Sequence, residues 1–172
     1  KTMIAALSMA FQCPSSDILG AYNVMPDIGS IAYAASQGEL NRIKLKPSTP
    51  IRLMVVRFGD KIIPGAYLHK FPSLRVQVHK KDEEISIFTN RLFNITSPLN
   101  ILIKPLGDIN GNFIIDADLI CFQDREICSQ TEVVRYINRR RLSRKSSISP
   151  ALLAYDLIYL QDEDLTSRDY AD

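Results

Sequence analysis

The amino-acid sequence predicts an α+β fold with a central antiparallel β-sheet and helices at the N- and C-terminal ends. The first forty-odd residues are rich in Ala and Met and are interrupted by Pro14 and Pro26, which is typical of short helices. From Lys44 to Phe122 the pattern changes to β-branched runs and to apolar–polar alternation. A helical pattern returns after Cys128.

A chain of 172 residues is long enough for one well-buried core and too short for two comfortable domains. Hydrophobic residues make up 46% and charged residues 23%, which excludes disorder throughout. We predict a single domain over 1–172. Its parts are a helical region at 1–43, a β-rich core at 44–128, a C-terminal helical region at 129–160 and an acidic tail at 161–172.

Three helices are expected in the first part. Thr2–Phe11 is an apolar run, and a turn follows over Asp17–Tyr22 after Pro14. Ser30 is the expected N-cap of a third helix over Ile31–Leu40, which has a narrow apolar stripe.

The clearest strand signal covers residues 74–79, where apolar and polar side chains alternate and predict one buried and one solvent-facing side. The Asn110-Gly111 pair predicts a hairpin, because both residues tolerate positive φ. The strands expected on either side of it are Asn100–Lys104 and Asn112–Phe122. Further strands are expected at Ile51–Phe58, Ala66–Lys70 and Ile85–Thr89.

The C-terminal part begins with a predicted helix. Ser129 and Glu132 fit a capping box, and Val133, Tyr136 and Ile137 form its apolar face. Pro150 then opens an apolar run over residues 151–160 that fits either a helix or a buried strand.

The charge changes sign within the last forty or so residues. A run of basic residues predicts a site for an anionic partner, RNA or acidic lipid, because clustered arginines make a local positive field. These residues are Arg135, Arg139, Arg140, Arg141, Arg144 and Lys145. A solvated surface without a partner is the alternative, and the acidic tail can act as a screen. Ser143 and Ser146 are possible phosphorylation sites, because a basophilic kinase prefers such a context.

No pattern of residues specifies catalysis or metal binding. Asp108–Asn112 departs from a calcium loop in the positions of its glycine and its last ligand. Asp116 and Asp118 share one face of a strand, but a metal or acid–base site needs a third group. His69 and His79 have no motif around them. The sequence therefore predicts no catalytic residues, no cofactor and no metal, with a hydrolase or transferase lacking a local motif as an alternative.

Three cysteines without regular spacing favour a reducing compartment over a disulfide framework. No apolar stretch approaches the roughly twenty residues that span a bilayer. Four apolar residues of the first predicted helix exceed what a short terminal helix must bury, which predicts self-association into a homo-oligomer. They are Met3, Ile4, Leu7 and Phe11.

One local resemblance bears on function. The segment Pro98–Leu102 leads through Lys104 to a long apolar strand that closes on residues 124–126, and this is similar to the central strand–turn–strand region of rhabdovirus matrix proteins. The chain length also resembles that of their plant-infecting members. The lysine-rich N-terminus and proline-rich motif of the animal-virus members do not appear here.

The resemblance implies a non-enzymatic structural protein of the virion and host cytoplasm. Such a protein self-associates, contacts the nucleocapsid and binds an anionic membrane peripherally. A small β-sheet module that binds RNA or another nucleic acid, viral or cellular, is the alternative from a different functional class.

Overall fold

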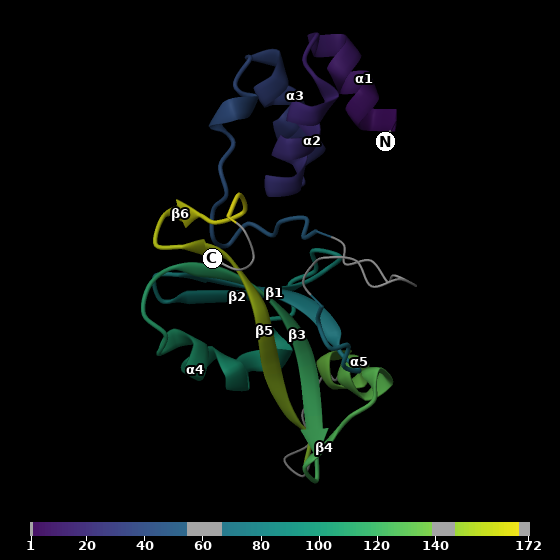
Figure 1. Cartoon of the computed structure of the whole chain (residues 1–172), viewed down its shortest axis with the longest axis vertical. Coiled ribbons are helices and arrows are strands. Elements are labelled where there is room, and N and C mark those ends of the chain that lie inside the picture. Colours follow the sequence, from purple (N-terminus) through teal and green to yellow (C-terminus); the bar gives the residue numbers. More distant parts are fainter. Residues whose placement is uncertain (1, 55–66, 139–146, 169–172) are drawn as a thin grey trace. The chain divides into compact units, whose positions relative to one another are not determined.

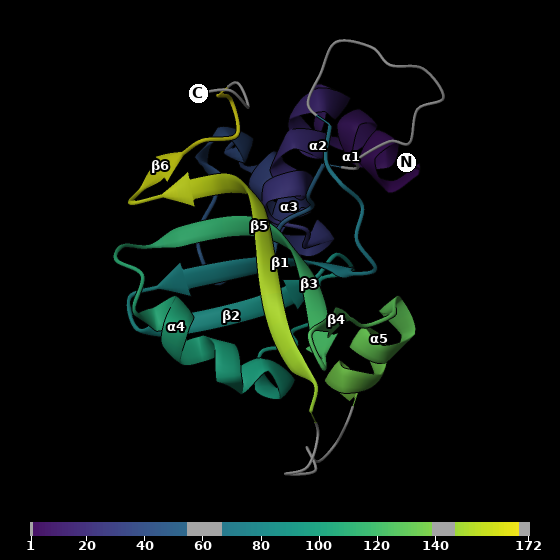
Figure 2. The ribbon, with the colours of Figure 1, turned by 60° about the horizontal axis from the view of Figure 1, so that its bottom comes forward.

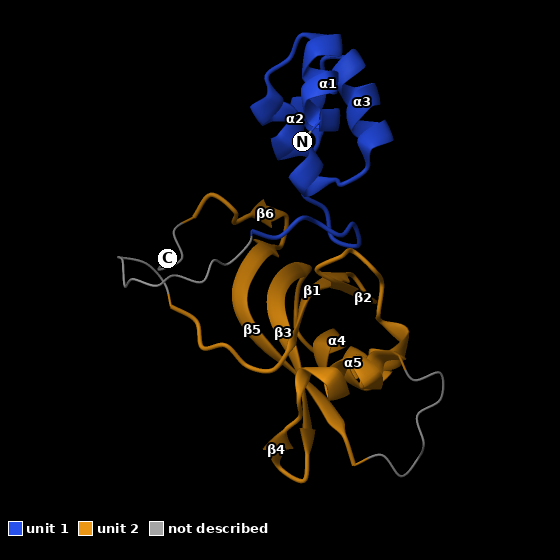
Figure 3. Cartoon of the chain, turned by 90° about the vertical axis from the view of Figure 1, so that its right-hand side faces the viewer, with its two compact units in different colours: residues 1–54 blue, residues 55–172 orange. Residues whose placement is uncertain are grey.

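The computed structural model describes residues 2–54, 67–138 and 147–168. The chain divides into two compact units, Lys1–Met54 and Val55–Asp172, which we call unit 1 and unit 2 (Figure 3). Each unit is described by itself.

Unit 1 is helical. Helices α1 (Thr2–Phe11), α2 (Ser15–Val24) and α3 (Ile28–Ser36) are followed by the 3₁₀ turn η1 (Leu40–Arg42). Ile18, Ala21 and Ile31 form its buried centre. The backbone N–H of Ser30 donates to the Asp27 side chain at 2.6 Å, so Asp27 caps α3 and the prediction of Ser30 as the N-cap is wrong.

Unit 2 is built on one antiparallel sheet, which confirms the α+β class (Figure 1). The strands run in the order β2-β1-β3-β5-β6, and β4 pairs with the end of β3. Their bounds are β1 Leu74–Lys81, β2 Glu84–Thr89, β3 Phe113–Gln123, β4 Glu126–Ile127, β5 Ser149–Leu160 and β6 Glu163–Asp164. The helical elements are η2 Ser97–Leu102, α4 Ile103–Gly107 and α5 Gln130–Asn138.

Two of the hairpins turn through residues with positive φ, as twisted two-residue hairpins require. Asp124 and Arg125 join β3 to β4, and Gln161 and Asp162 join β5 to β6. The Asn110-Gly111 pair does not join two strands, because helix α4 precedes it and β3 follows it. The hairpin predicted there is wrong.

The apolar face of the sheet holds the core of unit 2. Val76 and Val78 of β1 lie on this face with Ala117 and Leu119 of β3, as the alternation predicted. Helices α4 and α5 cover the same face (Figure 2). They contribute Leu106, Val133 and Tyr136 to the cluster. The polar side chains of β1 and β3 lie on the opposite face of the sheet.

Three expectations for secondary structure are wrong. Residues 100–104 are helical, in η2 and α4. Leu99 and Leu106 are separated by about two helical turns, so both side chains lie on the same side and pack in the core of the sheet. Residues 149–160 form strand β5, one of the two structures expected for the run 151–160, so only the helical label of this part of the region 129–160 is wrong; β3 offers a long edge that an apolar run can pair with. Residues 51–54 and 67–70 form no strand, and the remainder of the strands predicted there lies outside the described residues.

The capping box of α5 is confirmed. The Ser129 backbone N–H and its Oγ each donate to Glu132 Oε2 at 2.8 Å. These hydrogen bonds lower the pKa of Glu132. Among the described residues, no helix is long and apolar enough to cross a membrane.

Gly111 has a φ of +87°, and a Cβ added there would lie 2.9 Å from Gln161 Nε2. Replacing Gly111 with alanine should therefore lower the free energy of unfolding by roughly 2 kcal/mol, because left-handed backbone and steric overlap both oppose the new methyl group. Urea denaturation followed by circular dichroism measures this. Gly107→Ala is the control, since its Cβ would meet only Ile85 Cδ1 at 3.9 Å. Equal stability of the two variants would contradict the prediction.

Candidate functional site

Charged and polar side chains gather on the face of the sheet opposite the core. Arg75, Gln77 and His79 alternate along β1 with the core residues, and Asp116 and Asp118 do so along β3. The two strands are adjacent, so these five side chains form one polar face of unit 2. Most of it is buried: Gln77, His79, Asp116 and Asp118 are all among the buried residues.

Arg75 and Asp116 form the central ion pair of this polar face. Arg75 Nε donates to Oδ1 and Oδ2 of Asp116 at 3.0 and 3.2 Å, and its Nη2 also pairs with Oδ2. The Asp116 side chain is 3% exposed and that of Arg75 is 19% exposed. The hydrogen bonds to Asp116 raise the pKa of Arg75, so this guanidinium stays charged.

Tyr155 reaches the same pair from β5. The pairing of β5 with β3 shifts register next to Tyr155, since Asp116 faces Asp156 and Ala117 faces Ala154. Tyr155 lies at this bulge, between the two paired positions of β5, and its hydroxyl donates to Asp116 Oδ1 at 3.0 Å. Burial, with the Asp116 charge as a further cause, raises the pKa of Tyr155. The phenol therefore acts as a donor that holds the carboxylate.

Lys70 lies at the edge of the polar face, just before β1. Its Nζ donates to Ser73 Oγ at 3.0 Å and lies 3.7 Å from Asp118 Oδ2. The Lys70 side chain is 59% exposed, whereas that of Asp118 is 12% exposed. Ser73 is buried, and its carbonyl accepts a hydrogen bond from Gln130 Nε2 of α5 at 2.9 Å. The exposed amine of Lys70 is thus held by Ser73 and Asp118, whose own positions are fixed by the fold.

His79 and Gln77 form a buried pair. His79 Nε2 and Gln77 Oε1 are 2.9 Å apart, and the imidazole packs edge-on against Phe88. Burial lowers the pKa of His79 to about 4, so the ring is neutral at pH 7. The prediction that this side of β1 faces solvent is wrong, because Gln77 and His79 are fully buried.

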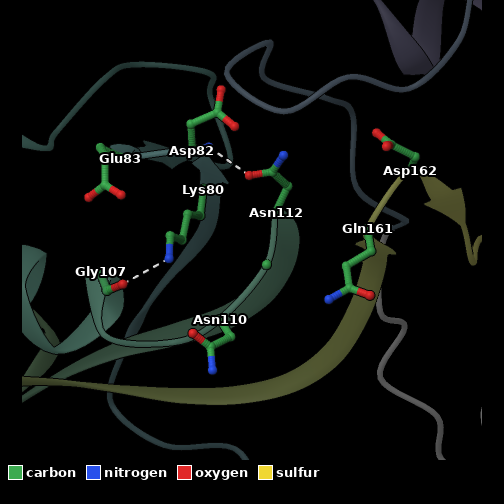
Figure 4. Close-up of a pocket in the computed structure, with 9 residues that line it drawn as sticks. Lys80, Asp82, Glu83, Gly107, Asn110, Asn112, Gln161 and Asp162 are labelled. Carbon is green, nitrogen blue, oxygen red and sulfur yellow. Dashed lines mark hydrogen bonds between the residues drawn. The ribbon is translucent and has the colours of Figure 1, made fainter.

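A separate polar pocket lies at the other end of β1 (Figure 4). Lys80, Asn110 and Gln161 are among the residues that line it. Lys80 Nζ donates to the carbonyl oxygens of Gly107 and Ile109, which leaves this amine committed to holding the backbone. Lys70, which precedes β1, and this pocket therefore belong to different sites.

The polar face combines an accessible amine, two carboxylates and a guanidinium. The described residues contain no group of three or more His, Cys, Asp or Glu that could hold a metal ion. The arrangement suits an anionic substrate, with Lys70 as a cation or, when deprotonated, as a nucleophile.

None of the predicted site residues that the structure describes belongs to the polar face. Arg135 is exposed on α5. The other basic residues, 139–141, 144 and 145, lie outside the described residues, as do Ser143 and Ser146. Binding of an anionic partner and phosphorylation there stay predictions.

The apolar residues of α1 divide into two kinds. Ile4 and Leu7 are partly buried against the centre of unit 1, whereas Met3 and Phe11 are exposed. Self-association through these four residues stays a prediction.

Sequence reasoning missed four residues that build the polar face: Lys70, Ser73, Arg75 and Tyr155. A signal was available, because Arg75 on an alternating strand needs a carboxylate partner once its face is buried. The sequence showed that Asp116 shares one face of its strand with Asp118. It could not show that β1 lies beside β3, since the two strands are far apart along the chain.

Comparison with known proteins identifies similar sequences. The family model described as "ATP dependent DNA ligase domain" matches residues 66–172. A DNA ligase of Methanothermobacter thermautotrophicus is 28% identical over an alignment that covers 95% of this chain and 32% of the relative. A DNA ligase of Saccharolobus islandicus is 31% identical, covering 97% of this chain and 31% of the relative. The chain thus spans about a third of the length of these relatives.

The likeness to solved structures is weaker. The structure of a mycobacterial DNA ligase D, complexed with ATP and MES, has a TM-score of 0.46 and 17% sequence identity. It covers 59% of this chain and 31% of the other.

The ligase matches overturn the resemblance to rhabdovirus matrix proteins. They also contradict the predictions that this resemblance carried: a non-enzymatic structural protein, a location in the virion, and nucleocapsid or membrane partners. The resemblance failed because it rested on the apolar strand β3 and the turn after it, which many antiparallel sheets share. The alternative of a small nucleic-acid-binding module comes closer to these matches but is not supported either.

Proposed function

The chain belongs to the ATP-dependent DNA ligase domain family, and from that premise we propose that the polar face of unit 2 binds ATP for a nucleotidyl transfer in which Lys70 is the nucleophile. In the whole protein, DNA is the second substrate. Because the chain spans about a third of its relatives, both the joining of DNA and the residues that complete the site are part of this proposal.

The observation that carries the proposal is the position of Lys70. Joining two pieces of DNA with ATP requires that a phosphate be activated, and a covalent enzyme intermediate divides such a reaction into two easier steps. Lys70 offers an exposed amine, which Ser73 Oγ and Asp118 hold in one place. Lys80 is committed to backbone carbonyls at the other end of β1, so it does not compete for this role.

The proposed step is an attack by the neutral amine on the α-phosphorus of ATP. The N–P bond forms as the bond to the bridging oxygen breaks, and that electron pair leaves with pyrophosphate. The proton that Lys70 loses passes to solvent, which the exposed amine reaches. Asp118 and Ser73 orient the amine before the attack, and Arg75, fixed by Asp116, contributes positive charge to the polar face where the triphosphate binds.

Incubation of the 172-residue chain with ATP and magnesium should yield a chain that carries one adenylyl group. Intact-mass spectrometry measures the adduct, peptide mapping should place it on Lys70, and added pyrophosphate should remove it. Lys70→Arg should abolish the adduct, because a guanidinium keeps the charge but is a poor nucleophile.

Lys104→Arg is the matched control. Lys104 is exposed on α4, which packs on the opposite, apolar face of the sheet, so its replacement should leave adduct formation unchanged. An adduct that survives Lys70→Arg would assign the nucleophile elsewhere. A chain that binds ATP without forming any adduct would act as a nucleotide-binding module, and the proposed transfer would be wrong.

A further inference from the structure

Two buried cysteines face each other across the hairpin that precedes α5. Phe122 pairs with Ile127, so the next residues outward, Cys121 and Cys128, stand opposite each other in the antiparallel ladder. The Cys128 N–H donates to the Cys121 carbonyl at 2.8 Å, and this is one of the two hydrogen bonds that define a hydrogen-bonded antiparallel pair. Both side chains belong to the same hydrophobic cluster, so they lie on the same face of the hairpin.

The backbone geometry fits a disulfide. In a hydrogen-bonded antiparallel pair the two Cα atoms are about 5.5 Å apart. Disulfides join Cα atoms that lie roughly 4.4–6.8 Å apart, most often near 5.5–6 Å. In the structure both thiols are free.

We propose that Cys121 and Cys128 form a redox pair, which an electrophilic oxidant converts reversibly into an intramolecular disulfide. The two thiols lose two protons and two electrons, and the S–S bond forms between the two sulfur atoms. A diazene oxidant such as diamide takes up both protons and both electrons and becomes a hydrazine. The proposal is independent of the nucleotidyl transfer proposed above.

The environment of the thiols limits how fast they react. Burial, with the neighbouring Cys128 as a further cause, raises the pKa of Cys121 to about 11. Burial also raises the pKa of Cys128. Because the thiolate is the reactive form, the pair should oxidise more slowly than an exposed thiol, and only as the hairpin opens locally.

The disulfide would fasten the end of β3 to the start of α5. Helix α5 begins at Gln130, two residues after Cys128, and Gln130 holds the Ser73 carbonyl. The bridge would therefore restrain the same part of the backbone that supports Lys70. The bridge closes a small ring over residues 121–128, so the hairpin has fewer conformations available when it opens.

The test uses the 172-residue chain carrying Cys13→Ser, so that Cys121 and Cys128 are its two cysteines. The folded, reduced chain is treated with diamide, unfolded in the presence of an alkylating agent and analysed by intact mass and peptide mapping. We expect a loss of two hydrogens, no alkylation, and a linked pair of peptides containing Cys121 and Cys128. Dithiothreitol should restore two alkylatable thiols.

Hydrogen exchange provides a second measurement. In the oxidised chain, exchange should slow at the β3–β4 turn and the start of α5, while unit 1 exchanges as before. Cys13→Ser with Cys128→Ser is the matched control, which should show no such change after diamide. Two alkylatable thiols after treatment of the folded chain, bridges only between molecules, or a bridge that forms only in denaturant would each overturn the proposal.

Discussion

Replacing Asp116 with alanine should lower the free energy of unfolding of the chain by about 3–5 kcal/mol, because it removes the carboxylate that forms an ion pair with a largely buried guanidinium. Arg75 directs three of its contacts to Asp116, and Tyr155 donates to the same carboxylate. Both groups lose the charged acceptor that offsets the cost of burying them, so the loss of this carboxylate should be expensive. Urea denaturation of the folded chain measures the loss.

Asp118→Ala is the matched control, because Asp118 lies on the same strand and the same face. Its partner Lys70 is mostly exposed and can be hydrated, so we expect a loss of about 1 kcal/mol or less. The two variants should also differ in adduct formation, since Asp118 contacts Lys70 directly and Asp116 does not. Equal losses of stability would show that Arg75 finds solvent or another partner when Asp116 is removed.

The second large effect concerns pH. His79 has a pKa of about 4 in the folded chain, against an ordinary value of 6.5. The unfolded chain therefore takes up a proton as the pH falls below about 6.5, whereas the folded chain does so only near pH 4. His79 thus contributes full stability above about pH 6.5 and loses it progressively down to about pH 4. The loss corresponds to about 3 kcal/mol.

The measurement compares urea denaturation at about pH 7.5 and about pH 4 for the parent chain and for His79→Gln, which cannot titrate. The variant should lose less stability on acidification than the parent, by about 3 kcal/mol. His69→Gln is the control, because His69 is exposed and its replacement should leave the pH dependence of the parent unchanged. The same acid sensitivity in His79→Gln as in the parent would contradict the assignment to His79.

Some elements could be predicted because their signals are local. The α5 cap depends on two residues three positions apart, and the alternation over residues 74–79 identifies both faces of β1. Periodicity could not separate helix from strand in the apolar run of 151–160, which became β5 because the edge of β3 was available to pair with it. Polar residues on one side of β1 predicted solvent exposure, but the fold buried Gln77 and His79.

The sequence by itself determined the fold class and the two faces of β1 and of β3. It did not determine the site, because Lys70, Arg75, Asp116 and Tyr155 are spread over more than eighty positions and no spacing rule connects them. Only the order β1-β3-β5 brings these side chains together, and only the bulge in β5 directs Tyr155 to Asp116. The physical reason is that strand pairing joins residues that are distant in the chain, and a non-local contact leaves no periodic signal in the sequence.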